Sequence, residues 1–160
     1  MNYNKEQILA ILATIADPEI PVISISEIGM LKDVIISENG YEVILTPTYT
    51  GCPAMGIIAE DIITKLKENN ISPVTVKTVF DTAWTTDNIS KEAKEKMRRY
   101  GIAPPLTRSC NNEIFTINVI PCPQCGSFNT VLVSRFGSTA CKAMYKCSDC
   151  MEPFEYFKCH

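Results

Sequence analysis

Apolar residues recur at helical spacing in residues 4–16 and 53–70. Positions three or four apart share one face of a helix, so each stretch predicts an amphipathic helix. Residues 90–101 predict a third helix, in which Glu92–Lys96 and Glu95–Arg99 are i,i+4 pairs. Ser90 can cap the third helix and Gly101 can end it. In the first two helices, the side chains expected to face the core are Ile8, Leu12 and Ile15, then Met55, Ala59, Ile62 and Leu66.

Two stretches alternate with the period of a β-strand. MLKDVIISENGYEVILTPT (residues 30–48) has two β-rich runs around Asn39 and Gly40, which a tight primed turn prefers, so it predicts a hairpin. VTVKTVFD (residues 74–81) predicts a half-buried strand. The resulting order, α-β-β-α-β-α, predicts an α+β fold in which helices pack on one small sheet.

The chain divides into two domains by composition. Residues 1–102 contain the α+β elements, residues 103–113 have the character of a linker, and residues 114–160 hold most of the cysteines. In the second part, TVLVSRF (residues 130–136) and KAMYK (residues 142–146) predict two strands of a hairpin.

Charge and hydropathy narrow the class of protein. The net charge is −3, and no block of lysine and arginine offers a basic face for phosphates, so we expect no nucleic-acid partner. No apolar run approaches the roughly 20 residues of a membrane span, and the N-terminus lacks a signal peptide. We therefore expect a cytoplasmic protein without a membrane partner, whose eight cysteines are metal ligands or reactive thiols.

The single histidine, His160, is the last residue, which argues against several mechanisms. The sequence has no HExxH zinc motif and no two-histidine iron site, and a Ser-His-Asp triad would need the terminal residue as its base. It also has no GxGxxG or P-loop motif. An oxygen-activating iron centre or a nucleotide site within this chain is therefore not expected.

Two C-x-x-C pairs in the second part predict a zinc ribbon. Cys122 with Cys125, and Cys147 with Cys150, each place two thiolates on one tight turn, and a hairpin can join the turns into a tetrahedral shell of sulfurs. A redox dithiol is the alternative, but that motif normally opens a helix in a βαβ unit, which neither pair does. A module of about 40 residues needs such a metal to fold.

Other residues near these pairs give weaker evidence for a metal site. Gly126 can take the positive φ that such turns favour, whereas Met151 stands at the equivalent position of the second turn. Cys141 is expected to be a small buried residue, and the roles of Cys159 and His160 stay open.

The segment TPTYTGCP places Cys52 between the end of a predicted strand and the start of a predicted helix. A thiol at a helix start faces unpaired amide groups and the positive end of the helix dipole, which favour the thiolate. Pro53 suits the first helical position, and Thr46 is a nearby hydroxyl. Cys52 is thus a candidate reactive thiol or transient metal ligand, while a buried packing role remains the alternative.

Several segments resemble known families. DPEIP, EIGMLKDV and TPTYTGCPA resemble the domain of iron–sulfur assembly proteins of the SufT and cytosolic-targeting-complex type. AWTTDNIS, YGIAPP, VSRFGSTACKAMYKC and EPFEYFKCH are similar to the PaaD family, the D subunits of bacterial phenylacetyl-CoA epoxidase systems in aerobic phenylacetate degradation. Together they span nearly the whole chain, with Met151 departing from the glycine expected in the family.

The resemblance implies an accessory protein that takes part in maturation of iron–sulfur or di-iron centres, or in assembly of the oxygenase. It implies the oxygenase and reductase subunits as partners, zinc as a bound metal and iron or an iron–sulfur cluster as a transient one. By matching motif, Asp17 and Glu19 fall in the family's acidic turn and Cys52 in its functional loop. The alternative is structural, with Asp17 capping the turn before Pro18 and Glu19 simply solvated.

The resemblance leaves two matters open. A cysteine-nucleophile enzyme acting on CoA thioesters is the alternative function, although no histidine lies near Cys52 in sequence. The oligomeric state, including a homo-oligomer, is also not decided by the sequence.

Overall fold

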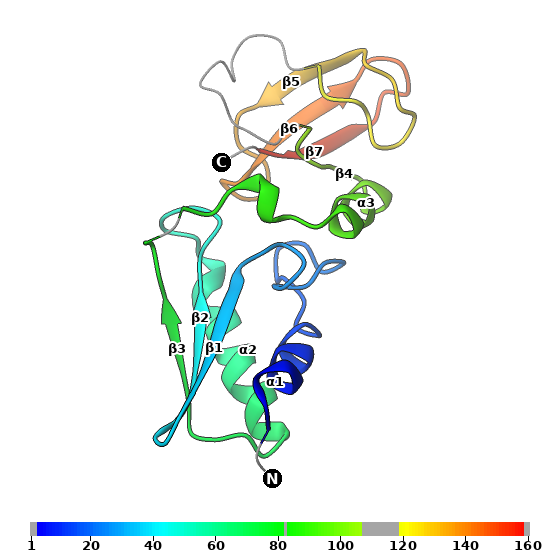
Figure 1. The fold of residues 1–160 in the computed structure, drawn as a ribbon. Helices are drawn as coiled ribbons and strands as arrows, with labels where there is room; N and C mark the ends of the chain where they lie inside the picture. The colour runs from blue at the N-terminus through cyan, green and yellow to red at the C-terminus, as the bar shows by residue number, and fades with distance from the viewer. Residues whose placement is uncertain (1–2, 82, 107–118, 159–160) are drawn as a thin grey trace. The chain divides into compact units, whose positions relative to one another are not determined.

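The computed structural model describes residues 3–81, 83–106 and 119–158. The chain forms two compact units, Met1–Trp84 and Thr85–His160 (Figure 1). No helix in the described ranges is both long and apolar enough to cross a membrane.

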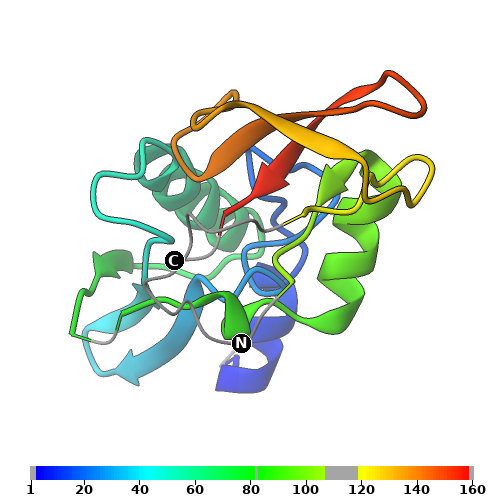
Figure 2. The ribbon, with the colours of Figure 1, turned by 90° about the horizontal axis from the view of Figure 1, so that it is seen from above.

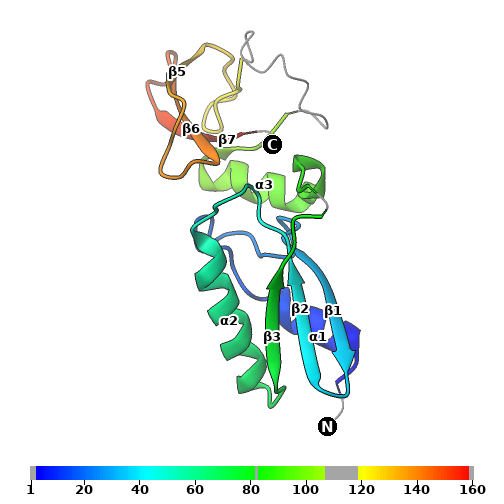
Figure 3. The ribbon, with the colours of Figure 1, turned by 90° about the vertical axis from the view of Figure 1, so that its left-hand side faces the viewer.

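The first unit is a three-stranded sheet with two helices. Strand β2 lies in the centre, antiparallel to β1 and parallel to β3 (Figure 3). Helix α1 packs against β1, helix α2 packs against β3, and the two helices contact each other. The elements are α1 (Lys5–Leu12), β1 (Leu31–Ser37), β2 (Gly40–Leu45), α2 (Ala54–Glu68) and β3 (Val74–Thr78). The predicted α+β order and the hairpin are confirmed.

The buried face of α2 differs from the predicted one by a small rotation. The predicted stripe began at Met55, but Met55 and Ala59 are only half-buried. The buried side chains are Ala54, Ile58, Ile62 and Leu66. Both stripes contain apolar residues four apart, so helical spacing alone could not distinguish the centre of the buried face from its border.

The hairpin turn also lies one residue earlier than predicted. Ser37 pairs with Gly40, so Glu38 and Asn39 form the turn in place of Asn39 and Gly40. Gly40 has a φ of 124°, and a Cβ there would lie 2.4 Å from the carbonyl oxygen of Pro73. A glycine is therefore required at position 40 by its positive φ and by the close approach of Pro73 at the entry to β3.

The second unit is a four-stranded sheet with a short 3-10 helix, η1, and helix α3. The strand order is β4-β7-β6-β5, so β5 forms one edge of the sheet (Figure 2). Strands β5 and β7 are both antiparallel to β6, and β4 is parallel to β7. The elements are η1 (Thr86–Asn88), α3 (Lys91–Tyr100), β4 (Ile102–Ala103), β5 (Thr130–Ser134), β6 (Lys142–Cys147) and β7 (Pro153–Phe157).

Helix α3 has the ends that the sequence predicts. The Ser90 hydroxyl accepts a hydrogen bond from the Ala93 amide at 3.0 Å, and Gly101 ends the helix with a φ of 97°. An ion pair between Arg99 and Glu95 spans one turn on its exposed side.

The boundary between the units differs from the predicted one. We expected residues 1–102 to form the first domain, but the structure divides the chain after Trp84 and places α3 in the second unit. Ile102 and Ala103 pair with Glu155 and Tyr156 of β7, which holds this segment on the second sheet. The predicted linker therefore begins on a strand, and most of its remainder lies outside the described residues.

The core of the second sheet is small and includes cysteine sulfur. Ala103, Ile120 and Phe154 are buried together with Cys122 and Cys147. Tyr145 and Tyr156 pack against this cluster with their rings 5.9 Å apart. Two of the five buried members of this cluster are thus the predicted metal ligands.

Candidate metal centre and thiol loop

The hairpin of β5 and β6 brings the two C-x-x-C turns together. The first turn precedes β5 and the second follows β6, and Thr130 pairs with Cys147 at this end of the hairpin. The sulfur atoms of the predicted ligands lie within 4.8 Å of one another; they belong to Cys122, Cys125, Cys147 and Cys150. Within the part of the chain that the structure describes, this is the one group of three or more potential ligands at such distances.

The sulfur geometry fits a tetrahedral metal ion. The Sγ atoms of Cys122 and Cys150 are 3.6 Å apart, as are those of Cys125 and Cys147. A zinc ion with Zn–S bonds of about 2.3 Å sets its ligands about 3.8 Å apart at the corners of a tetrahedron. A shell of four sulfurs is closed, with no position for a substrate, so this is a structural rather than a catalytic type of site.

Backbone amides in both turns donate to the sulfurs. The Ser127 amide donates to Cys125, and the Cys150 and Asp149 amides donate to Cys147. Such hydrogen bonds orient the thiolates and spread their negative charge. They are contacts that sequence spacing alone does not reveal.

The pKa values of two ligands move in opposite directions. The Cys150 amide, with that of Asp149, lowers the pKa of Cys147 to about 7. Although the Glu152 amide donates to Cys150, burial and the three neighbouring thiols raise the pKa of Cys150 to about 12. Four thiolates at this distance repel one another, so the fully ionised shell requires a cation at its centre.

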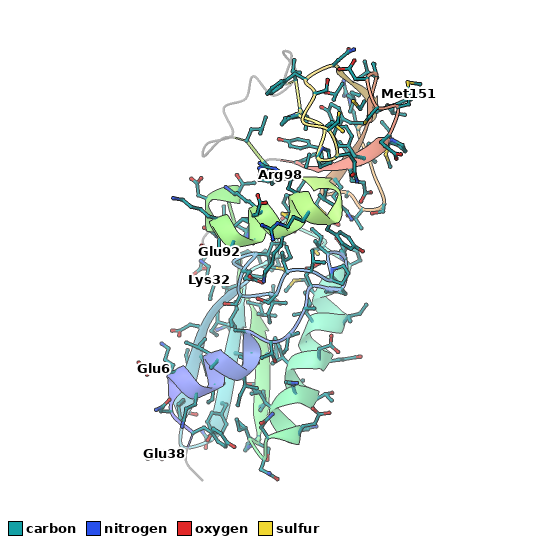
Figure 4. The ribbon with its side chains drawn as sticks, turned by 90° about the vertical axis from the view of Figure 1, so that its right-hand side faces the viewer. Glu6, Lys32, Glu38, Glu92, Arg98 and Met151 are labelled. Atoms are coloured by element: carbon teal, nitrogen blue, oxygen red, sulfur yellow. The ribbon has the colours of Figure 1, made fainter. Side chains whose placement is uncertain are left out.

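Both turns place a residue in the left-handed region directly after the second cysteine. Gly126 has a φ of 75° and Met151 a φ of 65°, so the equivalence predicted from the spacing holds in the backbone. A side chain is disfavoured in this region, and Met151 retains one there. Figure 4 shows Met151 at the surface of the second unit, where it is 59% exposed and packs little.

A polar cluster that the sequence did not reveal supports the second turn. The Asp149 carboxylate accepts a hydrogen bond from the Asn129 side chain at 2.8 Å and another from the Ser127 hydroxyl. These bonds lower the pKa of Asp149. The carboxylate therefore ties the second turn to the start of β5.

Cys52 lies in the loop between β2 and α2, as the sequence predicts. Its amide donates to the carbonyl of Tyr49 at 3.2 Å, and α2 begins two residues later at Ala54. The thiol is half-buried. Thr46 is buried at the end of β2, where its amide donates to Met30, and Thr48, also buried, has its hydroxyl hydrogen-bonded to the thiol.

The acidic turn of residues 17–19 contributes charge near this thiol. The buried Asp17 carboxylate accepts hydrogen bonds from the amides of Glu19 and Ile20, each at 2.8 Å. Asp17 therefore holds its own turn in shape, as the structural alternative requires. The charges of Glu19 and Asp17 also act on Cys52, so the fold brings these three predicted residues into one electrostatic environment.

The surroundings of Cys52 oppose the thiolate form that the helix start favours. Burial raises the pKa of the thiol above its ordinary value of 9.0, and the Glu19 and Asp17 carboxylates act in the same direction. The Ala54 amide donates a hydrogen bond to the sulfur, as the helix start predicts, but this effect is smaller than burial. At neutral pH the thiol is therefore protonated.

The remaining cysteines have less defined roles. Cys141 is buried, as predicted, and its sulfur lies 3.0 Å from the Thr139 hydroxyl. Cys159 and His160 lie outside the described residues.

Two protein families match different parts of the chain. The family described as an iron–sulfur cluster assembly protein matches residues 5–79, and the PaaD zinc beta ribbon domain matches residues 108–158. The first match contains Cys52 with Asp17 and Glu19, and the second contains all four sulfurs of the metal centre.

One relative extends the likeness to nearly the whole chain. A protein of Escherichia coli strain K12, provisionally named as the D subunit of 1,2-phenylacetyl-CoA epoxidase, is 45% identical over 96% of this chain and 92% of its own length. An Fe-S protein maturation auxiliary factor of Porphyromonas gingivalis is 33% identical over 56% of this chain and 86% of its own length.

A solved structure resembles part of the fold. It is a domain of unknown function from Bacillus anthracis, with a TM-score of 0.52 and 29% identity, and the match covers 56% of this chain and 87% of that one.

Proposed function

The chain belongs to the PaaD family, the D subunits of phenylacetyl-CoA epoxidase, and from this premise we propose that it matures or assembles the metal centres of such an oxygenase. In this proposal it acts on the oxygenase and reductase subunits as an accessory factor, with iron or an iron–sulfur cluster as its cargo. The relative named as an Fe-S maturation factor supports the same role for the first unit.

The observation that carries the proposal is the surroundings of the Cys52 thiol. It combines a half-buried soft ligand, Cys52, with the carboxylates of Glu19 and Asp17, whose charges act on it. Sulfur and carboxylate oxygen are both ligands for iron. A loop between a strand and a helix is also a position from which a side chain can reach a partner.

The arrangement suits brief contact with a metal better than storage. Iron–sulfur clusters are usually held by four cysteines, and this loop supplies one. Because the raised pKa keeps Cys52 protonated, binding a metal requires loss of a proton and is correspondingly weaker at neutral pH. A ligand of this kind can accept a metal and release it to a subunit that offers a more complete set.

The second unit supplies a docking module in this proposal. Its four sulfurs fit a closed zinc site, which leaves no coordination position for transferred iron. Zinc would be held by Cys122, Cys125, Cys147 and Cys150 and would stabilise the hairpin between them.

The alternative, a nucleophilic enzyme for CoA thioesters, has less support. The thiolate is the nucleophilic form of cysteine, and burial favours the protonated form of Cys52. An enzyme of this type would need a base that lowers the barrier to ionisation, whereas Glu19 and Asp17 place negative charge near the sulfur and oppose it.

The test is the metal content of the oxygenase made with and without this protein. We expect its loss to leave the oxygenase subunits present but under-metallated, and Cys52→Ser to reproduce the defect. Cys141→Ser is the matched control, since a serine there keeps the hydrogen bond with Thr139 and leaves Cys52 intact. Elemental analysis of the purified oxygenase measures the outcome.

A reconstitution separates maturation from a structural role. A fully metallated oxygenase complex should turn over at its full rate without this protein. If the metallated complex instead requires the protein in equal amount, it is a structural subunit and the maturation proposal is wrong.

A further inference from the structure

Among the described elements of the second unit, the edge strand β5 has the most exposed apolar side chains. Val131, Leu132 and Val133 are 50%, 48% and 61% exposed, although they are consecutive and therefore point to both faces of the sheet. Phe128 and Phe136 at the two ends are 67% and 64% exposed. In Figure 2 the strand lies at the end of the sheet, with β6 on its inner side.

This edge has few of the features that prevent pairing with another strand. Edge strands are usually protected by proline, charged residues or a cover of other elements. From Thr130 to Ser134 there is neither proline nor charge. The protective feature that β5 does have is an irregularity in its pairing with β6, between Leu132 and Ser134. Within the described ranges, β5 pairs with β6 and with no strand on its other side. Such an open row of backbone groups, with an apolar surface on both faces, favours a strand as its partner.

The sequence of this segment is nearly palindromic about Leu132. Residues 128–136 read FNTVLVSRF, so each residue before Leu132 has a similar or complementary residue at the same distance after it. If two copies of this strand pair antiparallel about a two-fold axis at Leu132, Leu132 faces its own copy. Each residue before Leu132 then faces the residue at the same distance after it in the other copy. Within β5 the facing pairs are then Val131 with Val133 and Thr130 with Ser134. Just beyond its ends, Asn129 comes near Arg135 and Phe128 near Phe136 of the other copy.

Charge is complementary in the same register. Arg135 of one copy would lie opposite Asn129 of the second copy, whose side chain holds the Asp149 carboxylate at 2.8 Å. At the other end of the same strand the arrangement repeats, because a two-fold interface presents each contact twice. A cation therefore meets an anion at both ends, while Leu132 and the valines meet apolar partners in the middle.

We infer that β5 pairs antiparallel with β5 of a second copy of this chain, centred on Leu132, and joins the two four-stranded sheets into one. The pairing covers the exposed apolar edge and brings Phe128 of each copy against Phe136 of the other. A single pair of short strands buries less than the roughly 1,200 Å² of a standard interface, so the dimer is expected to be dissociable.

The first test is the mass of the full, zinc-loaded chain in solution as a function of concentration. We expect a monomer–dimer equilibrium by analytical ultracentrifugation, and we expect Leu132→Lys to shift it to monomer because two lysines then face each other at the axis. Ile35→Lys is the matched control: Ile35 is 46% exposed and lies on β1, an edge strand of the other sheet. Zinc content shows that both variants retain the folded ribbon.

The second test fixes the register. Leu132→Cys should form a disulfide between copies under mild oxidation, detected by mass spectrometry as a peptide linked at position 132. Ser134→Cys should not link to itself, because the two positions are four residues apart along the paired strands, about 13 Å.

Three results would overturn the inference. One is a chain that stays monomeric over the whole concentration series. Another is a dimer that Leu132→Lys leaves intact or that links as readily at position 134. The third is a monomeric chain whose capture of an epoxidase subunit is lost in Leu132→Lys, which would assign the edge to a strand of that partner.

Discussion

The two units of the chain are stabilised in different ways. The first has a continuous aliphatic core, in which Ile8, Leu12, Ile58, Ile62 and Leu66 have no exposed surface. Around the metal centre of the second, the described residues include a buried cluster of five, and two of the five are cysteines. The first unit can therefore be stabilised by apolar burial alone, whereas the second needs a metal ion to hold its hairpin.

The units also use cysteine in opposite ways. In the second unit, backbone amides donate to Cys125, Cys147 and Cys150, and the four thiols lie close enough to share one ion. In the first unit a single thiol lies near two carboxylates and is kept protonated. Permanent binding requires several converging ligands, while transient binding requires one ligand that can be given up.

The largest expected effect comes from removing one ligand of the metal centre. Cys125→Ser should abolish stoichiometric zinc binding and unfold the sheet of the second unit, because structural zinc contributes on the order of 10 kcal/mol to the folding of small modules. Hydrogen exchange should show lost protection in β6 and unchanged protection in β2. Cys52→Ser, the same chemical change in the other unit, should keep its zinc.

A core substitution in the first unit gives the reciprocal control. Ile58→Ala removes a fully buried side chain and should lower the stability of the first unit by about 2–5 kcal/mol without changing the zinc content. A second unit that stays folded without metal, or zinc that is lost in Ile58→Ala, would contradict the contrast between the two units.

An intermediate effect is expected from the two residues in the left-handed region. Met151→Gly should relieve backbone strain and Gly126→Ala should introduce it, by about 1 kcal/mol each and with opposite sign. A Cβ on Gly126 meets no atom within 4 Å, so the effect of Gly126→Ala comes from the backbone conformation and not from a steric clash. Zinc competition with a chelator should show about fivefold tighter binding in one variant and about fivefold weaker binding in the other.

Equal effects of the same sign in these two variants would show that packing of the side chains, and not φ, decides the strength of the two turns.

The smallest effect concerns the pKa of Cys52. Glu19→Gln removes a negative charge that raises this pKa, so the midpoint of alkylation rate against pH should move down toward the ordinary value of 9.0 while remaining above it because of burial. Since the folded-state pKa lies above the unfolded one, the contribution of the protonated thiol to stability is complete below pH 9 and is lost as the pH rises through the folded pKa.

Cys52→Ser removes that alkaline loss and is the control for it. A Cys52 midpoint below 9.0 in the unsubstituted protein would show that the helix start outweighs burial and would restore the thiolate expectation.

Local sequence signals predicted much of this structure. The Ser90 cap, the Gly101 helix end and the β1–β2 hairpin depend on neighbouring residues, and the structure confirms each of them. The ligands of the metal centre were also predictable, because each pair lies on one turn and the spacing between pairs fits a hairpin.

Contacts between residues far apart in the sequence could not be predicted from such local signals. The pairing of Ile102 and Ala103 with β7 involves residues about fifty positions apart, and a two-residue strand has no periodicity to detect. The pKa of Cys52 depends on burial and on an acidic turn more than thirty residues earlier, so the helix start alone gave the wrong direction.

The segment from Thr85 to Leu106 bears on where the ribbon domain of this protein begins. It lies between the two family matches, which end at residue 79 and begin at residue 108, yet α3 and β4 belong to the second unit. A ribbon excised at residue 108 would leave one side of β7 unpaired and lose Ala103 from its core. As a transplantable module, the ribbon of this chain begins near Thr85, and the extra helix and strand are part of what is inherited with it.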